Sequence, residues 1–284
     1  MRAALFIHGF LSGPDDWDRI HPYLAKDYDH IEVFKQPGHE RLDSPVKPKM
    51  KDFTADAAYK KIDSLFDELE KEYSEIDVIG HSMGGAMAIY LAGTRKIRKL
   101  VLLAPAISYL RFDFFFAKNI EEDRLKEIST KNGYEQLYKN SQTDFQNSLD
   151  VFFKRILPYT NPITLLTLSK ISEIGKHFVD KTNVPFLILW GKLDEFIPES
   201  GINEIMEKSL SSTKYRIDYD NYGHAMLYLS GWKEIAEDIR AFLNDEDLFE
   251  TKSSDYPMKT VTKITSKKNE ETTIIKKYKI DIKQ

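Results

Sequence analysis

Ser82 lies between Gly80 and Gly84, where an apolar run of the chain gives way to a run of small residues. A Gly-x-Ser-x-Gly turn raises its serine onto a sharp strand-to-helix corner, and glycine lets the neighbouring backbones approach closely. The same spacing also occurs in plain turns that pack a helix on a sheet. Because a predicted strand precedes Ser82 and a predicted helix follows it, we interpret this serine as a nucleophile.

A serine hydroxyl needs a general base to take its proton and a carboxylate to orient that base. His224 is the best placed of the seven histidines, because it follows a predicted strand in a loop at the carboxyl edge of the sheet. Asp194 follows another buried strand, and the order serine, aspartate, histidine is typical of such a turn. We therefore predict Ser82, Asp194 and His224 as the catalytic residues.

Other side chains compete for these roles. Glu195, Asp218 and Asp220 are rivals for the acid, although Asp218 is expected within a strand and Asp220 lies close to His224 in sequence. We expect the side chain of His81 to point away from the nucleophile and to be structural. The remaining candidate histidines lie in contexts typical of solvated side chains, and they are His21, His30, His39 and His177.

Acyl transfer also needs N–H donors directed at the developing oxyanion, each contributing about 3 kcal/mol of barrier reduction in other hydrolases. The backbone N–H of Met83 follows the nucleophile at a helix N-terminus. The backbone N–H of Phe10 lies in the loop that leaves the first strand. His-Gly-Phe alone is equally consistent with a plain turn, and the nearby strand and serine turn favour an oxyanion hole.

The elements that must position these residues alternate along the chain. Apolar runs predict strands at residues 2–7, 31–34, 76–79, 100–103, 184–190 and 215–219. Helical periodicity is found at residues 17–24, 52–73, 200–210 and 228–243. This alternation predicts an α/β fold with a mostly parallel, doubly wound sheet.

Residues 107–180 interrupt the alternation with a helical, aromatic-rich pattern, which predicts a helical insertion, called the cap below, in a core made of residues 1–106 and 181–245. Aromatic and aliphatic side chains of this cap either line an apolar acyl pocket or form its own packing. The residues predicted to line the pocket are Phe112, Phe115, Phe116, Phe153 and Leu157.

Residues 246–284 form a tail whose composition differs from that of the body. Residues 251–284 contain nine lysines and four acidic residues, a net +5, whereas the whole chain carries −4 and the remainder therefore −9. Two β-prone runs at residues 259–265 and 272–282 predict a hairpin. A lone hairpin is marginal in water, so it either pairs with a sheet edge of its own body, bridges two copies as a homodimer, or stays disordered.

Composition limits the functional classes. The acidic body argues against a nucleic-acid partner, since phosphate contacts need a cationic face. No apolar run approaches the roughly 20 residues of a transmembrane helix, and the apolar N-terminus is interpreted as a strand rather than a signal peptide. The absence of cysteine excludes disulfides and makes a cytoplasmic protein the expectation. No motif for a metal or a cofactor is present, and none is expected.

Four ordered motifs resemble the α/β-hydrolase fold, in particular its monoacylglycerol-lipase and carboxylesterase-like members. They are Phe-Ile-His-Gly-Phe at residues 6–10, Gly-His-Ser-Met-Gly-Gly at 80–85, Leu-Trp-Gly-Lys-Leu-Asp at 189–194, and Gly-His at 223–224. The resemblance covers residues 1–106 and 181–245 and not the cap or tail. Dehalogenases and epoxide hydrolases of this family carry aspartate at the position of Ser82, which argues against those reactions.

The resemblance implies a serine hydrolase that cleaves carboxylic esters of small to medium apolar acyl groups through an acyl-serine intermediate. A non-catalytic binding or regulatory protein on the same fold remains an alternative, as does an acyltransferase or another serine hydrolase. An intact Ser82, Asp194 and His224 favours the enzyme, because a pure binder has no chemical need of all three.

Overall fold

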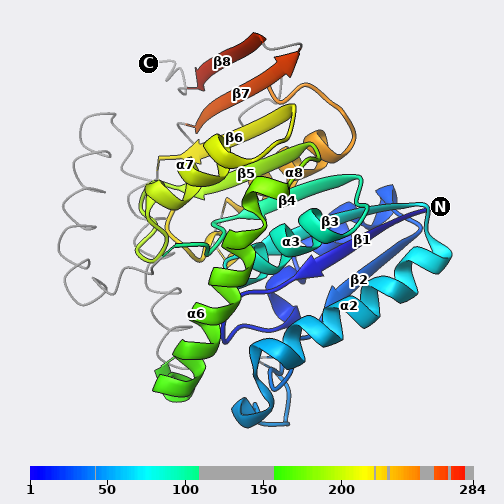
Figure 1. Ribbon diagram of the computed structural model, residues 1–284, viewed down its shortest axis with the longest axis vertical. Helices are drawn as coiled ribbons and strands as arrows, with labels where there is room; N and C mark the ends of the chain where they lie inside the picture. The colour runs from blue at the N-terminus through cyan, green and yellow to red at the C-terminus, as the bar shows by residue number, and fades with distance from the viewer. Residues whose placement is uncertain are drawn as a thin grey trace.

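The computed structural model describes residues 1–41, 43–108, 157–220, 222–228, 231–249, 259–267 and 270–278. Within these ranges, eight strands form one sheet in the order β2-β1-β3-β4-β5-β6-β7-β8 (Figure 1). Neighbouring strands from β2 to β6 pair in parallel, and β7 and β8 complete the sheet in antiparallel fashion. The strands are β1 Arg2–Ile7, β2 His30–Phe34, β3 Glu75–His81, β4 Lys99–Leu103, β5 Phe186–Gly191, β6 Thr213–Tyr219, β7 Lys259–Lys267 and β8 Glu270–Tyr278.

Helices cover both faces of this sheet, so the predicted α/β architecture is confirmed (Figure 1). One face carries α2 Ala55–Glu72, α3 Met83–Thr94, α6 Pro162–His177 and α7 Glu199–Lys208. The other face carries α1 Ile20–Leu24 and α8 Trp232–Leu243. None of the helices within the described ranges has the length and apolar character needed to cross a bilayer.

The central strands form because their sequences suit burial on both faces. Every residue of β4 and β5 is buried, and so is every residue of β3 after Glu75. Alternate side chains enter opposite cores, as Leu100 and Leu102 do on the α3 face and Val101 and Leu103 on the α8 face. The carboxyl ends of these parallel strands therefore lie at one edge of the sheet, where the site is built.

The segment predicted as a cap contributes a helix to the core layer. α6 packs along α3 so closely that a Cβ on Gly175 would lie 2.7 Å from the Cβ of Ala86. The hydroxyl of Tyr59 in α2 also donates a hydrogen bond to the carbonyl of Ile171, at 3.1 Å. Residues 162–177 thus pack as part of the helical layer, whereas residues 109–156 of the predicted cap lie outside the described ranges.

The last helix of the body begins later than its periodicity predicts. Residues 228–243 were expected to be continuous, but α8 begins at Trp232, after a separate short turn, η7 Met226–Tyr228. Gly231 lies directly before α8 because the Tyr222 side chain packs against it and leaves no room for a Cβ. This turn begins two residues after His224.

The tail forms the predicted hairpin and pairs with the edge of its own body. β7 runs antiparallel to β6 from Thr213 opposite Thr265 to Tyr219 opposite Lys259. Val261 is fully buried on the α8 face of the sheet. The Lys259 ammonium donates to both carboxylate oxygens of Asp238 in α8, at 2.7 and 2.8 Å.

Candidate active site

Ser82 lies on a strained turn between β3 and α3. Its φ is 53° and its ψ is −118°, a conformation that residues with a side chain seldom adopt. The two flanking glycines make the turn possible. A Cβ on Gly80 would overlap the carbonyl oxygen of Gly84, and a Cβ on Gly84 would overlap that of Ile7 in β1.

The structure brings three of the predicted residues into one hydrogen-bonded row. The Ser82 hydroxyl lies 2.9 Å from Nε2 of His224, and Nδ1 of His224 lies 2.9 Å from Oδ2 of Asp194. Since a carboxylate only accepts, Nδ1 carries the proton and Nε2 is free to accept from the serine hydroxyl. The arrangement can pass a proton from the serine to the imidazole.

The loop after β5 fixes the acid. Asp194 Oδ1 accepts hydrogen bonds from the backbone N–H of Phe196 at 2.9 Å and from that of Ile197 at 2.8 Å. Its side chain is fully buried, whereas that of His224 is 14% exposed. The Phe196 ring also packs edge-on against the imidazole, with centroids 5.2 Å apart. Asp194 is therefore held with one oxygen left for the histidine.

The rival carboxylates have other partners. Asp218 pairs with Arg216 at 2.7 Å, and Asp220 pairs with Lys192 at 2.6 Å. Glu195 accepts a hydrogen bond from the backbone N–H of His224 at 3.0 Å, so it holds the loop rather than the imidazole. Burial, together with the neighbouring Asp194 charge, raises the pKa of Glu195.

The environment of His224 favours its protonated form. Burial lowers the pKa of this imidazole, but the charge and the hydrogen bond of Asp194 act in the opposite direction and prevail. The pKa of His224 is therefore raised above its ordinary value. A neutral imidazole at moderately alkaline pH can act as a base, and its conjugate acid is stabilised once formed.

His81 does not point away from the site as we expected. Its ring lies 5.2 Å from that of His224, and its Nε2 donates to the carbonyl of His224 at 3.2 Å. On its other side, Nδ1 lies 3.7 Å from a carboxylate oxygen of Asp16. The predicted orientation of the His81 side chain is therefore wrong, because the loop that carries His224 folds back over this side chain.

Asp16 is a buried carboxylate that lies directly before the helix predicted at residues 17–24. It accepts hydrogen bonds from Ser12 Oγ at 2.5 Å, from the Gly9 N–H at 3.4 Å and from the Tyr228 hydroxyl. Burial raises the pKa of Asp16, but His81 and Ser12 lower it more, so the net pKa is well below its usual range. The sequence signal that could have identified Asp16 is its position between the Ser-Gly-Pro turn and Trp17.

The loop after β1 passes against the nucleophile. A Cβ on Gly9 would lie 3.3 Å from the Cβ of Ser82 and 3.4 Å from Nδ1 of His81, so this loop lies directly against the nucleophile. The N–H of Leu11 donates to Nε2 of His39 at 3.1 Å, and Leu11 has a φ of 53°. His39 is only 1% exposed, so the expectation that it is solvated is wrong.

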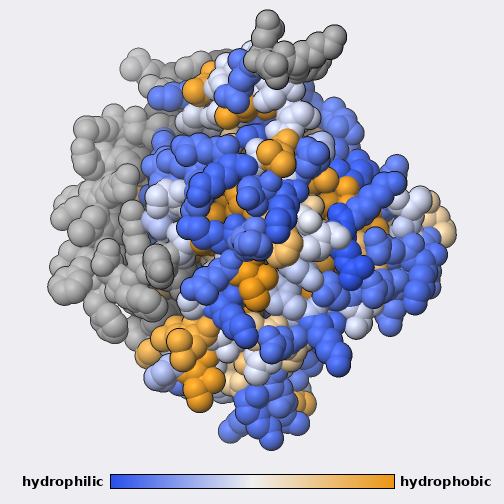
Figure 2. All heavy atoms as spheres, viewed as in Figure 1, coloured by the Kyte–Doolittle hydropathy of each residue, from blue (hydrophilic) through white to orange (hydrophobic). Residues whose placement is uncertain are grey.

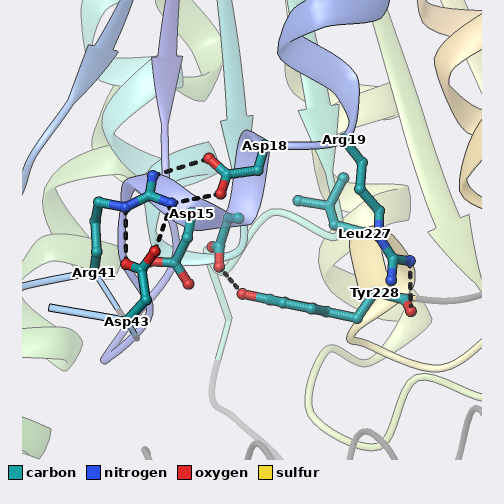
Figure 3. Close-up of a pocket in the computed structure, with 8 residues that line it drawn as sticks. Asp15, Asp18, Arg19, Arg41, Asp43, Leu227 and Tyr228 are labelled. Atoms are coloured by element: carbon teal, nitrogen blue, oxygen red, sulfur yellow. Dashed lines mark hydrogen bonds and ion pairs between the residues drawn. The ribbon is translucent and has the colours of Figure 1, made fainter.

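A cavity of about 350 Å³ opens beyond Asp16, but it does not include the serine or the histidine (Figure 3). Its cationic side chain Arg41 is bound on one side by Asp18, at 2.6 Å, and on the other by Asp43, at 3.0 Å. The residues that line it are Asp15, Asp16, Asp18, Arg19, Arg41, Asp43, Leu227 and Tyr228.

Most of the predicted acyl pocket lies outside the described residues. These are Phe112, Phe115, Phe116 and Phe153, whereas Leu157 lies in the short turn η5 Leu157–Tyr159 and is 45% exposed. Nearby in sequence, Ile163 and Leu166 of α6 are 71% and 70% exposed, and Figure 2 shows apolar residues gathered over one end of this helix. Within the described ranges no group of three or more metal-binding side chains is found.

Comparisons with known proteins agree on one family. The model of the alpha/beta hydrolase family matches residues 4–238. Monoacylglycerol lipase ABHD6 of Homo sapiens is 25% identical over 248 residues, which cover 79% of this chain and 70% of the relative. Lipase 3 of Moraxella sp. (strain TA144) is 26% identical over 262 residues, covering 84% of this chain and 76% of that protein.

A solved structure supports the same fold. The crystal structure of Paleococcus ferrophilus monoacylglycerol lipase superposes with a TM-score of 0.62. The alignment covers 86% of this chain and 95% of that one at 19% identity, a level at which the likeness concerns the fold alone.

Proposed function

This chain belongs to the alpha/beta hydrolase family, and from that membership and the geometry of its site we propose that it is a serine hydrolase of carboxylic esters. The observation that carries the proposal is the row from Ser82 through His224 to Asp194, with both hydrogen bonds at 2.9 Å. Relatives named as monoacylglycerol lipase and lipase support an ester substrate. The aromatic composition of residues 107–180 favours a small to medium apolar acyl group.

The first half of the reaction forms an acyl-serine. His224 Nε2 takes the proton of the Ser82 hydroxyl while Oγ attacks the ester carbonyl carbon. The charge that develops on the carbonyl oxygen is stabilised by the backbone N–H groups of Met83 and Phe10. The tetrahedral intermediate then collapses, the bond to the alcohol oxygen breaks, and His224 gives its proton to the departing alcohol.

The second half releases the acid. Water attacks the acyl carbon while His224 takes one of its protons, and the intermediate collapses to a carboxylic acid with return of the proton to Ser82 Oγ. The carboxylate of Asp194 stabilises the imidazolium, which agrees with the raised pKa of His224. An alcohol in place of this water would make the reaction an acyl transfer.

Substitution of the nucleophile tests the proposal. We expect Ser82→Ala to lower kcat/KM for p-nitrophenyl acetate, butyrate and octanoate by at least about a thousandfold, because the remaining groups cannot form an acyl-enzyme. Ser74→Ala is the matched control, since Ser74 is exposed before β3 at the opposite end of the strand. Both variants should melt within a few degrees of the wild type.

Two outcomes would contradict the proposal. A Ser82→Ala protein with more than a few per cent of wild-type activity would exclude Ser82 as the nucleophile. A wild-type protein that binds these esters without releasing acid or alcohol would favour the non-catalytic alternative. Product analysis with added glycerol separates hydrolysis from acyl transfer, since only transfer yields a glyceride.

A further inference from the structure

The outermost strand of the sheet is long, regular and exposed. β8 pairs with β7 in one uninterrupted antiparallel register, from Lys267 opposite Glu270 to Lys259 opposite Tyr278, with no bulge. Within the described part of the chain, no strand pairs with its outer side (Figure 1). An edge of this kind presents a row of backbone N–H and C=O groups that can accept another strand.

The neighbouring strand holds this edge firmly on the body. β7 is fixed by the buried Lys259 and Asp238 pair and by Val261 in the core. In β8, by contrast, every residue from 271 to 277 is exposed, including Ile274 at 48% and Ile275 at 60%. Natural edges are commonly protected by charges, proline or bulges. β8 carries charges, among them Glu271 and Lys277, but it has no proline or bulge and exposes an isoleucine on each face.

We propose that β8 is the surface through which two copies of this chain associate, strand against antiparallel strand, so that one sheet continues across a two-fold axis. This inference does not depend on the proposed esterase function. Homodimers with two-fold symmetry bring the same patch of both copies together, so the strand must complement itself. The sequence of β8 has this property.

Symmetry and the pleat restrict the register. Opposed side chains in a sheet lie on the same face, and a two-fold axis perpendicular to the sheet keeps each side chain on its own face. At such an axis, one residue of β8 therefore lies opposite the same residue of the other copy. With Ile274 at the axis, each Glu271 faces a Lys277 of the other copy, and each Thr273 faces an Ile275.

Charge complementarity limits the choice to two registers. With Ile274 at the axis each Glu271 faces a Lys277, and with Thr273 at the axis each Glu270 would face a Lys276. We place Ile274 at the axis because this register also brings the exposed Ile274 side chains of the two copies together on the other face, whereas the Thr273 register would set each Glu271 against Ile275. The partner that fits this edge best is thus a second copy of the chain.

The proposed interface is small. A pair of strands over seven residues buries less than the roughly 1,200–2,000 Å² of a stable complex. We therefore expect a dimer that dissociates on dilution. Sedimentation velocity of the full chain, from low micromolar to several hundred micromolar, should show a reversible shift from the mass of one chain to that of two.

Charge reversal tests the register. Glu271→Lys and Lys277→Glu should each weaken dimerisation by about tenfold, because each places like charges opposite one another twice. The double variant restores both pairs with reversed polarity, so it should recover most of the wild-type affinity. Lys276→Glu makes the same charge change one residue away, on the opposite face, and distinguishes the registers: it would face Thr272 with Ile274 at the axis and Glu270 with Thr273 at the axis. Because the Lys276 ammonium also donates to the carbonyl of Phe249 at 2.8 Å, the melting temperature of this variant is measured as well.

The outcomes are distinct. Recovery in the double variant, with little effect of Lys276→Glu, supports the strand pair in this register. A wild type that stays monomeric over the whole range, or a dimer that all four variants leave unchanged, would overturn the proposal. Ester hydrolysis measured in parallel should not change, and equal melting temperatures exclude misfolding as the cause of dissociation.

Discussion

Ser82 holds a backbone conformation with a φ of 53°, and the strain is enforced by its neighbours. Gly80 and Gly84 allow the first turn of α3 to lie against β1 and β3, since any side chain there would overlap a carbonyl group. Backbone strain of this kind persists where the surrounding packing fixes the conformation, and it is found most often at functional sites. The turn around Ser82 was predictable because both glycines lie within two residues of it.

The environment of His224 predicts the pH dependence of the reaction. The pKa of the His224 imidazole is raised above 6.5, and only the neutral imidazole can act as a base. We therefore expect the acidic limb of the pH–rate profile, where kcat/KM falls with decreasing pH, to have its midpoint above pH 6.5. Asp194→Asn removes the charge that raises this pKa, so it should move the limb to lower pH. The maximal rate should fall steeply as well, by about ten-thousandfold in a comparable triad.

The control for that variant is Asp220→Asn. Asp220 is a rival carboxylate that pairs with Lys192, so its neutralisation should leave both the limb and the rate nearly unchanged. A wild-type limb below pH 6.5, or a larger effect of Asp220→Asn than of Asp194→Asn, would show that the acid is assigned incorrectly.

Asp16 acts on the site through its neighbours. It faces His81, which holds the carbonyl of His224, and it also binds the amide of Gly9 beside Ser82. Asp16→Asn keeps the shape and removes the charge, so we expect kcat to fall about ten- to a hundredfold with a small change in KM, because misplaced groups lose catalytic geometry. The charge of Asp16 also raises the pKa of His224, so the acidic limb should move to lower pH.

Asp15→Asn is the matched control, since that carboxylate lines the outer cavity. The pH–rate profile separates positioning from mere stability, because a purely structural defect lowers the amount of active enzyme without moving the limb. An Asp16→Asn protein with wild-type kcat and pH profile would show that Asp16 has no role in the reaction.

At the scale of elements, the strands were predicted more accurately than the helices around them. β3, β4 and β5 are nearly continuous apolar runs, and burial on both faces leaves few alternatives for such sequences. α6 was included in the predicted cap because an amphipathic pattern shows that a face is buried and does not show against what. The start of α8 was missed because Gly231 is required by the Tyr222 side chain, a contact that periodicity does not reveal.

The hairpin illustrates how a tertiary contact fixes a marginal element. Lys259 is 3% exposed and Asp238 is fully buried, so each of these buried charges is compensated by the other. Lys259→Ala should lower the free energy of global unfolding, or that of local opening of the hairpin, by about 3–5 kcal/mol. The reason is that the substitution leaves the Asp238 carboxylate buried without this partner. Denaturant unfolding and hydrogen exchange of the β7 amides measure the two effects.

Lys263→Ala provides the comparison on the same strand. Its ammonium lies over the Tyr215 ring at 5.1 Å and is half-buried, so its loss should cost less than about 1 kcal/mol. Equal effects of the two substitutions would contradict the anchoring role of Lys259.

At the scale of the whole molecule, the sheet brings together residues that are far apart in sequence. Ser82 and His224 are separated by 142 positions, yet they follow the carboxyl ends of two parallel strands, β3 and β6, at one edge of the sheet. Their meeting was predictable, because all parallel strands present their carboxyl ends there. Asp16, His39 and the docked tail were not, because their partners are set by loop paths and by side-chain contacts that leave no period in the sequence.

The nucleophilic role of Ser82 is the central claim, and covalent labelling tests it most directly. A fluorophosphonate should react with the native protein with loss of fluoride, and mass spectrometry should place one phosphonyl group on the peptide that contains Ser82, in step with the loss of ester hydrolysis. His224→Ala should label far more slowly, because the hydroxyl then keeps its proton. Undiminished hydrolysis by a fully labelled protein, or a modified residue other than Ser82 in an inactivated one, would contradict the account.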